Sequence, residues 1–234
     1  MKPLKYRTMS EIAAEAIREA IGAAVYPPGT RLVPLKLEKE LGLGRTAIRE
    51  ALKELTFTGL LISVPNKGAV VAEPPEMDEI EQIFEVRYLT EGKAAYLATR
   101  RMTPDVLRRL EEAHEKMCAN SISSPDFFAL NREFHLAIYQ LSGWTFLYQI
   151  VVQLVEKVRL FRAYYPLRVQ DFASSNRDHE EILSSLRRAD AKKVSHLIVK
   201  NVSSASESMR EGQALRKEGS IKLPAQGKSI RLNL

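Results

Sequence analysis

Apolar residues in the first quarter of the chain recur at the three- and four-residue spacing of amphipathic helices. This spacing is found over residues 8–24, 35–41 and 45–57, and Gly42-Leu43-Gly44 separates the last two stretches. Two helices joined by a short glycine-containing turn are typical of a helix-turn-helix. The pattern therefore predicts a helix-turn-helix here, with Gly44 as the N-cap of its second helix.

The apolar pattern then changes from helical spacing to short runs of β-forming residues. Two such runs, 60–64 and 69–72, flank the turn Pro65-Asn66-Lys67-Gly68, and residues 30–33 can supply a third short strand. Strand, tight turn and strand predict a hairpin. A helix-turn-helix followed by a hairpin predicts a winged helix, which we place at residues 1–73, before the breaker pair Pro74-Pro75.

The rest of the chain has helical periodicity and no segment that resembles a strand. Helix-start signals are found at Thr103-Pro104, Ser124-Pro125 and Asp190. We predict about six helices in an antiparallel bundle over residues 77–210, which makes the protein mainly α. The tail, 211–234, has weak periodicity, and we expect it to be mostly disordered.

The predicted second helix of the helix-turn-helix carries Arg45 and Thr46 in its first turn and Arg49 one turn later. Because Ile48 and Leu52 mark the inward face, both arginines must point away from the core. Arginine binds guanine bidentately, and helix N-termini attract phosphate. A net charge of +6 permits nucleic-acid binding. The alternative is an ordinary solvated face on which nearby glutamates pair with the arginines.

These motifs resemble the DNA-binding head of the GntR family of bacterial transcription regulators. The resemblance rests on PGTRL, LGLGRTAIREALKEL, GLL and PNKGAVV, in that order and spacing, and spans nearly all of residues 8–72. It implies contacts to operator DNA from Arg45, Thr46, Arg49, Lys36, Asn66, Lys67 and Gly68. The chain departs from the family at Gly44, where many members have Ser or Thr, and at the apolar run 33–35.

Histidines are candidates for chemistry in the second module. His135 comes four residues after Asn131, so both side chains can face one site, and His179 comes from a later helix. Imidazole rings that enter an apolar bundle need partners, because a buried polar group without a hydrogen bond is costly. A metal, water or a bound anion would satisfy them.

The second module resembles the FCD effector domain of the FadR subfamily of GntR regulators, through EVRYLTEGKAA, NREFH, DHEEIL and RRADAKK. In many members an Asp and three His hold one divalent metal beside a small carboxylate effector. Those positions fall here on Asn131, His135, His179 and Asn201. Asparagine is a poor ligand for transition metals. The resemblance therefore implies either Zn or Ni held weakly, together with the effector carboxylate, or an effector bound directly.

Two arginines complete the expected effector site, whose members are Arg87, Asn131, His135, Arg159, His179 and Asn201. In the family an arginine at position 87 can face the effector, and arginine clamps carboxylates bidentately. The alternative for Arg87 is an intrahelical salt bridge with Glu91, four residues on.

The expected function is transcriptional regulation, as a repressor that binds a palindromic operator as a homodimer and responds to a small organic acid. The single cysteine, Cys118, and the lack of a signal peptide or long apolar run predict a cytoplasmic protein without a membrane partner. Alternatives are a metal-free acyl-CoA or fatty-acid sensor, a hydrolase based on His135 and His179, and an architectural nucleic-acid protein. No nucleophile motif supports the hydrolase, so we do not expect an enzyme.

Overall fold

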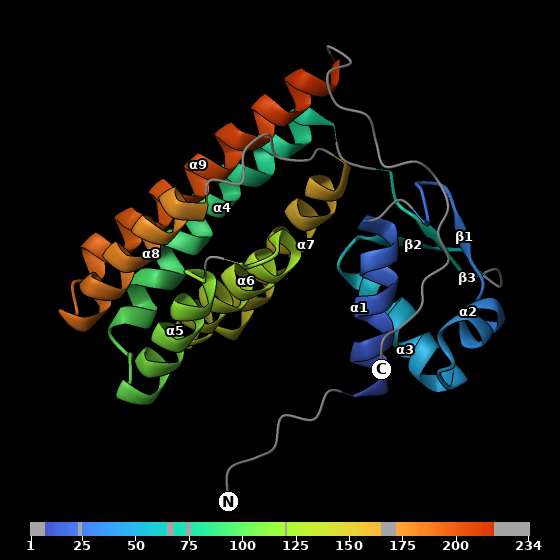
Figure 1. Cartoon of the computed structure of the whole chain (residues 1–234), viewed down its shortest axis with the longest axis horizontal. Helices are drawn as coiled ribbons and strands as arrows, with labels where there is room; N and C mark the ends of the chain where they lie inside the picture. The colour runs from blue at the N-terminus through green and yellow to red at the C-terminus, as the bar shows by residue number, and fades with distance from the viewer. Residues whose placement is uncertain are drawn as a thin grey trace, which may run out of the picture. The chain divides into compact units, whose positions relative to one another are not determined.

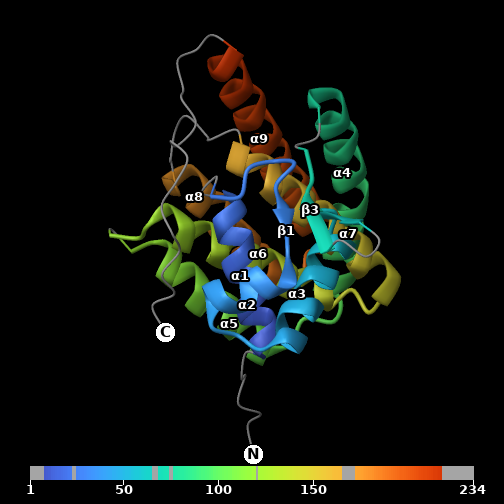
Figure 2. The same cartoon turned by 90° about the vertical axis from the view of Figure 1, so that its right-hand side faces the viewer.

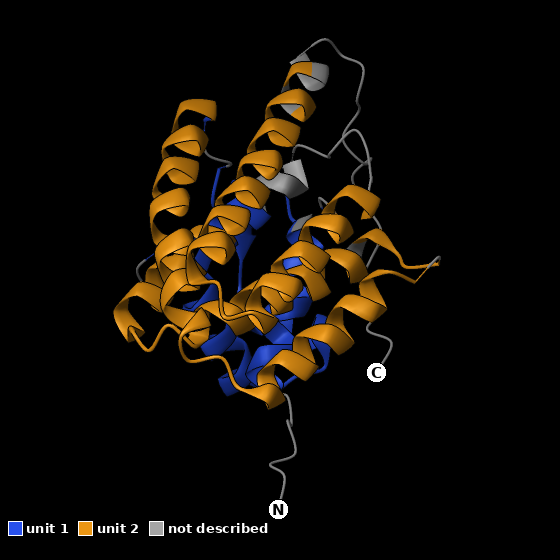
Figure 3. Cartoon of the chain, turned by 90° about the vertical axis from the view of Figure 1, so that its left-hand side faces the viewer, with its two compact units in different colours: residues 1–76, 156–166, 215–234 blue, residues 77–155, 167–214 orange. Residues whose placement is uncertain are grey.

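The structure is a computed structural model that describes residues 8–22, 25–64, 68–73, 76–119, 121–164 and 172–217. It divides into two compact units, shown in blue and orange in Figure 3. The head comprises Met1–Glu76, Glu156–Pro166 and Leu215–Leu234, and the helical unit comprises Met77–Val155 and Leu167–Ala214.

The residues at the ends of the first two helices of the head explain where these helices begin and end. Helix α1 (Met9–Gly22) begins with a capping box, in which Thr8 Oγ1 accepts from the Glu11 N–H at 3.2 Å. The Glu11 carboxylate accepts in return from the Thr8 N–H at 2.7 Å. Helix α2 (Pro34–Leu41) starts at a proline, which needs no N–H partner there, and ends at Gly42 with a φ of 65°.

The recognition helix and the wing follow the predicted order. Helix α3 (Arg45–Phe57) has Gly44 as its N-cap, as predicted, and this glycine offers no side-chain acceptor. Strands β1 (Arg31–Leu32), β2 (Leu61–Val64) and β3 (Gly68–Val71) form an antiparallel sheet in the order β1-β3-β2. Figure 2 shows β1 beside β3, which confirms the third short strand.

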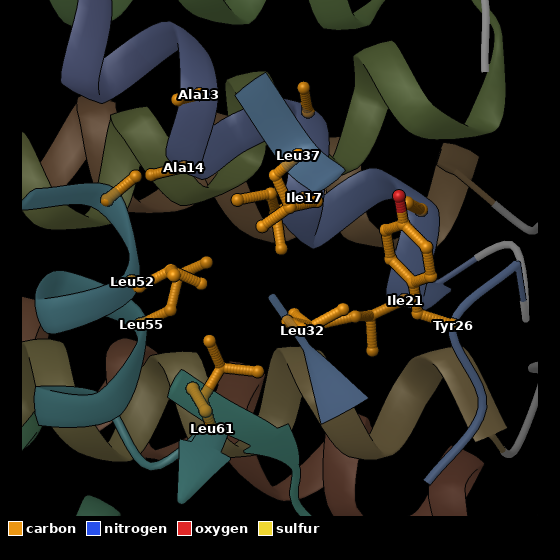
Figure 4. Packing of buried hydrophobic residues seen from close by; sticks show 14 of the residues in the cluster. Ala13, Ala14, Ile17, Ile21, Tyr26, Leu32, Leu37, Leu52, Leu55 and Leu61 are labelled. Atoms are coloured by element: carbon orange, nitrogen blue, oxygen red, sulfur yellow. The ribbon is translucent and has the colours of Figure 1, made fainter. Parts of the chain in front are cut away.

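The core of the head is apolar. The four positions that periodicity placed inside, Ile48, Ala51, Leu52 and Leu55, are all buried. They belong to one buried cluster with the Ala and Ile stripe of α1 and with one residue of each outer strand. Figure 4 shows Leu52 and Leu55 in this cluster. Small residues on α1 allow close approach of α3, so burial of this stripe fixes which face of α3 remains outside.

The helical unit contains helices and no strand among its described residues. Its helices are α4 (Met77–Thr99), α5 (Pro104–Met117), α6 (Ser124–Gln140), α7 (Thr145–Tyr164), α8 (Phe172–Arg187) and α9 (Ala191–Lys217) (Figure 1). The last part of α7, from Glu156, is grouped with the head. Most consecutive helices are joined by short turns, as expected of an antiparallel bundle.

Predicted helix starts are confirmed at their caps. Thr103 Oγ1 accepts from the Val106 N–H at 3.4 Å, and Asp190 Oδ1 accepts from the Lys193 N–H at 3.0 Å. Helix α6 begins at Ser124 as predicted, and the residue before it, Ser123, supplies the cap.

Helix α9 continues further than the sequence suggested. Periodicity indicated an end near Arg210, whereas the helix runs to Lys217. Met209 is fully buried and Arg210 pairs with Glu81 of α4 at 3.1 Å, so packing extends the helix through the weak helix former Gly212. Residues 218–234 of the expected disordered tail lie outside the described residues. Within the described part of the chain, none of the helices is long and apolar enough to cross a membrane.

Candidate DNA-binding surface and buried polar chain

The predicted recognition residues lie on the outer face of α3. Arg45 is largely exposed, and Thr46 and Arg49 are exposed as well. Arg45 Nε lies 3.8 Å from a carboxylate oxygen of Glu38 on α2, at the limit of an ion pair. This arrangement leaves two guanidinium groups at the N-terminal end of an exposed helix, as a base-reading helix requires.

The solvated-face alternative needs glutamates that neutralise these arginines. Glu50 instead pairs with Lys53 at 2.8 Å, and Glu54 pairs with Arg18 of α1 at 3.0 Å. Within the described residues Arg49 has no ion pair. The positive charge at the start of α3 is therefore available to a polyanion.

Lys36 is exposed near the start of α2 and lies 3.5 Å from Glu40, one turn on. An exposed pair of this kind is weak, so it does not hold Lys36 away from a phosphate. Glu40 also accepts a 2.5 Å hydrogen bond from the Tyr26 hydroxyl. Burial, and then this carboxylate, raise the pKa of Tyr26.

At the wing, Asn66 and Lys67 lie outside the described residues, and Gly68 opens β3 with a φ of 91°. A Cβ on Gly68 would lie 2.6 Å from the carbonyl oxygen of Leu32 in β1. The family resemblance implied a contact between this glycine and DNA. The structure supplies a reason inside the protein, because only glycine fits this backbone conformation beside β1.

In the helical unit, Arg87 and Glu91 of α4 form a buried ion pair. Arg87 Nε donates to Glu91 Oε1 at 2.5 Å, which is the intrahelical pair foreseen as the alternative to effector binding. The guanidinium also lies 4.9 Å from the centre of the Phe84 ring. Arg87 Nη1 nevertheless remains buried without a hydrogen-bond partner. The pair therefore occupies only part of the guanidinium.

Hydrogen bonds continue from this ion pair to two imidazoles. The Tyr139 hydroxyl donates to Glu91 Oε2 at 2.7 Å and lies 3.3 Å from His135 Nδ1. His135 Nε2 lies 3.3 Å from Nε2 of His179 on α8. We call these five residues, Arg87, Glu91, Tyr139, His135 and His179, the buried polar chain. All five are at least nine-tenths buried.

Burial sets the protonation states along the buried polar chain. It raises the pKa of Tyr139 well above its ordinary value, and the Glu91 carboxylate adds to this effect. It also lowers the pKa of His179 to about 2, helped by the neighbouring His135 and His114 and opposed by Asp178. Near neutral pH, Tyr139 therefore keeps its proton and His179 is uncharged.

The structure brings together only part of the predicted effector set. Asn131 is half-buried one turn before His135. The Asn201 amide donates to Asp178 at 3.4 Å, so it is engaged away from the imidazole pair. Arg159 belongs to the head, where it pairs with Glu15 at 2.5 Å. His135 and His179 meet as predicted.

Sequence reasoning missed two residues of this region, Tyr139 and His114. The His114 ring centre lies 6.0 Å from that of His179, and His114 Nε2 is 3.3 Å from Glu180. A signal was present, because His114 lies on the buried stripe of α5 between Leu110 and Met117. Tyr139 follows His135 by one helical turn and faces the same way.

The described residues contain no group of three or more His, Cys, Asp and Glu side chains arranged to hold a metal. The two imidazoles have a spacing that suits a metal, because their Nε2 atoms are 3.3 Å apart. Two ligands at about 2.05 Å from a tetrahedral zinc lie roughly 3.3 Å apart. The pair can thus supply two ligands, and other groups would have to complete the coordination.

Comparison with known proteins identifies the class. Residues 9–71 match the family described as bacterial regulatory proteins of the gntR family, and residues 82–203 match the FCD domain. The chain therefore belongs to the GntR family and carries an FCD domain after its DNA-binding head. It is a DNA-binding transcriptional regulator. GntR regulators bind operator DNA and usually form homodimers.

Individual relatives agree with this assignment. The HTH-type transcriptional regulator McbR of Escherichia coli is 25% identical over 202 residues, which cover 83% of this chain and 90% of McbR. The Nta operon transcriptional regulator of Aminobacter aminovorans is 31% identical over 138 residues, covering 58% of this chain and 65% of that protein. The solved structure of E. coli McbR/YncC matches with a TM-score of 0.67 at 24% identity, covering 92% of this chain and 100% of that one. That likeness shows the fold.

Proposed function

We propose that this regulator is a cytoplasmic repressor of the FadR subfamily whose affinity for a palindromic operator is controlled by a small organic acid bound in the helical unit. One observation supports the effector site above all others. Two polar atoms of the buried polar chain, Arg87 Nη1 and His179 Nδ1, are buried without hydrogen-bond partners. Such atoms are costly to leave unsatisfied, so they favour a ligand that completes them.

The charges already present in the buried polar chain limit which ligands can bind there. Glu91 already offsets the charge of Arg87, and His179 is neutral near pH 7. A carboxylate that entered alone would add an uncompensated buried charge, which is strongly unfavourable. A divalent cation on His135 and His179 would offset it. We therefore propose that Zn²⁺ or Ni²⁺ and the acid bind together, the acid completing a coordination that Asn131 and Asn201 support poorly.

Dimerisation is needed because one recognition helix covers only a half-site, and two-fold symmetry matches a palindrome. The helical unit exposes large apolar side chains that could serve it. Val86 and Leu89 of α4 and Trp144 and Phe146 near the start of α7 are exposed. An apolar surface left open to water favours association with a partner. We propose that it lies in the dimer interface.

A thermal-shift matrix tests the effector proposal. Small organic acids, sugar acids and acyl-CoAs are each added to the full chain with Zn²⁺, with Ni²⁺ and with a chelator. We expect that one of the acids raises the Tm only when a metal is present. In Arg87→Met, the part of the Tm shift that depends on the acid should be lost. Arg109→Met on α5, an exposed arginine, is the matched control.

Three results would contradict the proposal as stated. Stabilisation by an acid in the presence of chelator would show that binding of the acid needs no metal. Stabilisation by acyl-CoA alone would favour the metal-free fatty-acid sensor. A hit that shifts the Tm but leaves operator affinity unchanged would separate the ligand from regulation, because a regulator must couple the two sites.

A further inference from the structure

The buried polar chain contains a fixed order of donors and acceptors. Glu91 receives the Arg87 Nε–H on one oxygen and the Tyr139 hydroxyl on the other. A carboxylate paired with arginine is an acceptor only. The single proton of the Tyr139 hydroxyl is therefore committed to Glu91.

That commitment decides what His135 can do. The Tyr139 oxygen has only acceptor capacity left, so the imidazole nitrogen that faces it, His135 Nδ1, must be the donor. A neutral imidazole carries one N–H, so the other nitrogen, His135 Nε2, holds a lone pair. This lone pair faces His179 Nε2 at 3.3 Å.

We infer that Glu91 and Tyr139 are positioning residues that lock His135 into the tautomer protonated at Nδ1. The lock presents Nε2 of His135 as an acceptor or ligand. In the absence of metal and effector, His179 then donates from Nε2 to His135 and leaves its own Nδ1 without a proton. The Nδ1 atom of His179, which has no hydrogen-bond partner, is then a buried open acceptor. The role of this lone pair as a ligand rests on the proposed function, whereas the tautomer itself does not.

The buried polar chain also explains how the two histidines could bind a metal without the acidic ligand of the family. A ligating histidine that donates its other ring N–H to a fixed acceptor has its ring oriented and its basicity raised. Here the carboxylate lies two hydrogen bonds from the ring, on α4, and Tyr139 connects it to α6. Glu91 is thus a buried charge with a function beyond its ion pair.

Ring-nitrogen NMR of the ¹⁵N-labelled full chain tests the inference directly. The measurement is made at pH 7.5 with chelator, and the rings are assigned by loss of signals in His135→Gln and His179→Gln. We expect the proton of His135 on Nδ1 and that of His179 on Nε2. A proton on Nε2 of His135 would overturn the inference without the need for any further variant.

Two variants probe the cause. Tyr139→Phe removes the acceptor and should let the His135 proton redistribute between the two nitrogens, whereas Tyr148→Phe on α7 should change nothing. In Glu91→Gln the amide can donate to the Tyr139 oxygen, which frees the hydroxyl proton to point at His135, so its tautomer should reverse. An unchanged His135 tautomer in both folded variants would overturn the inference.

A zinc titration separates this inference from the proposed function. Against a chromogenic chelator, Tyr139→Phe should bind Zn²⁺ roughly 10–100-fold more weakly than the wild type, as removal of a supporting hydrogen bond does. Equal affinity would contradict the positioning role. If the wild type binds no Zn²⁺, the metal part of the proposed function fails, and the ring-nitrogen spectra still decide the tautomer.

Discussion

The head and the helical unit bury different kinds of residue. In the head the described buried residues are apolar apart from Thr58 and Glu156, and the arginines of the recognition helix, Arg45 and Arg49, are exposed. In the helical unit an arginine, a glutamate and three histidines lie inside. A polyanion is bound by exposed cations on a rigid support, whereas a small molecule is bound by polar groups kept away from water. The two recognition tasks thus lead to opposite distributions of charge.

The largest expected effect is on the charged interior of the helical unit. Glu91→Ala leaves Arg87 buried without its counter-charge, which should lower the free energy of unfolding by about 3–5 kcal/mol. Urea unfolding followed by circular dichroism measures it. The double variant Arg87→Met/Glu91→Leu should recover most of the loss, because an apolar pair needs no compensation. A loss below about 0.5 kcal/mol for Glu91→Ala would show that the pair is not buried in solution.

The next effect concerns the head alone. Arg49→Ala should weaken binding to the preferred operator by about 1–3 kcal/mol, the value of one bidentate contact to guanine. Fluorescence anisotropy with labelled duplexes measures this loss, and Arg108→Ala on α5 serves as the exposed control. The Tm should not change, because the Arg49 side chain packs outside the core.

The same titration distinguishes base reading from phosphate contact. If Arg49 reads a base, preference at one operator position relaxes. If Arg49→Ala weakens binding to all duplexes equally, and the salt dependence of binding falls by about one phosphate contact, the base-reading role is wrong.

Acid should affect the helical unit through His179. Its pKa is depressed to about 2 in the folded state, so the unfolded chain binds the extra proton as pH falls below about 6.5. Its contribution is complete above pH 6.5 and is lost progressively as pH falls from there toward pH 2. At pH 5.5 the loss should be about 1.4 kcal/mol.

Unfolding of wild type and His179→Gln with chelator present, at pH 7.5 and 5.5, isolates this contribution. The variant should lose less stability on acidification than the wild type, by about the same 1.4 kcal/mol. Identical losses would show that the ring is protonated, or exposed, in the folded protein.

The smallest effect is at the start of α3. Gly44 caps this helix without a side-chain acceptor, its φ is −66°, and nothing lies within 4 Å of an added Cβ. Gly44→Ser should therefore stabilise the head by a few tenths of a kcal/mol. Differential scanning calorimetry can detect the shift, with Gly68→Ser as a contrast, since that side chain would collide with β1. Destabilisation by Gly44→Ser would mean that another group already caps α3.

The two units also differ in how much of their structure could be predicted from the sequence. In the head, local signals sufficed: glycines at 42 and 44 mark the turn, and the burial of Ile48 and Leu55 follows from spacing along one helix. In the helical unit the decisive contacts join separate helices. The meeting of Tyr139 with Glu91, 48 residues earlier, depends on how α4 packs against α6.

Two details show why that packing could not be read from periodicity. The resemblance places a ligand position of the family on Asn201, yet its amide donates to Asp178 of another helix. His114 has the spacing of a core residue, and periodicity cannot say which neighbours such a residue meets. Spacing within one helix gives a face, and the partner of that face comes only from the fold.

The central claim is that the head binds DNA and the helical unit binds the small molecule. Its most direct test is selection of binding sites from random duplex DNA by the purified full chain. We predict enrichment of one palindrome with half-sites about one helical turn apart, or a multiple of that distance. Arg45→Ala/Arg49→Ala should lose that enrichment, and His135→Gln/His179→Gln should keep the same sequence. No enrichment by the wild type, with candidate acids and metals both absent and present, would contradict the account, as would a changed sequence in the histidine variant.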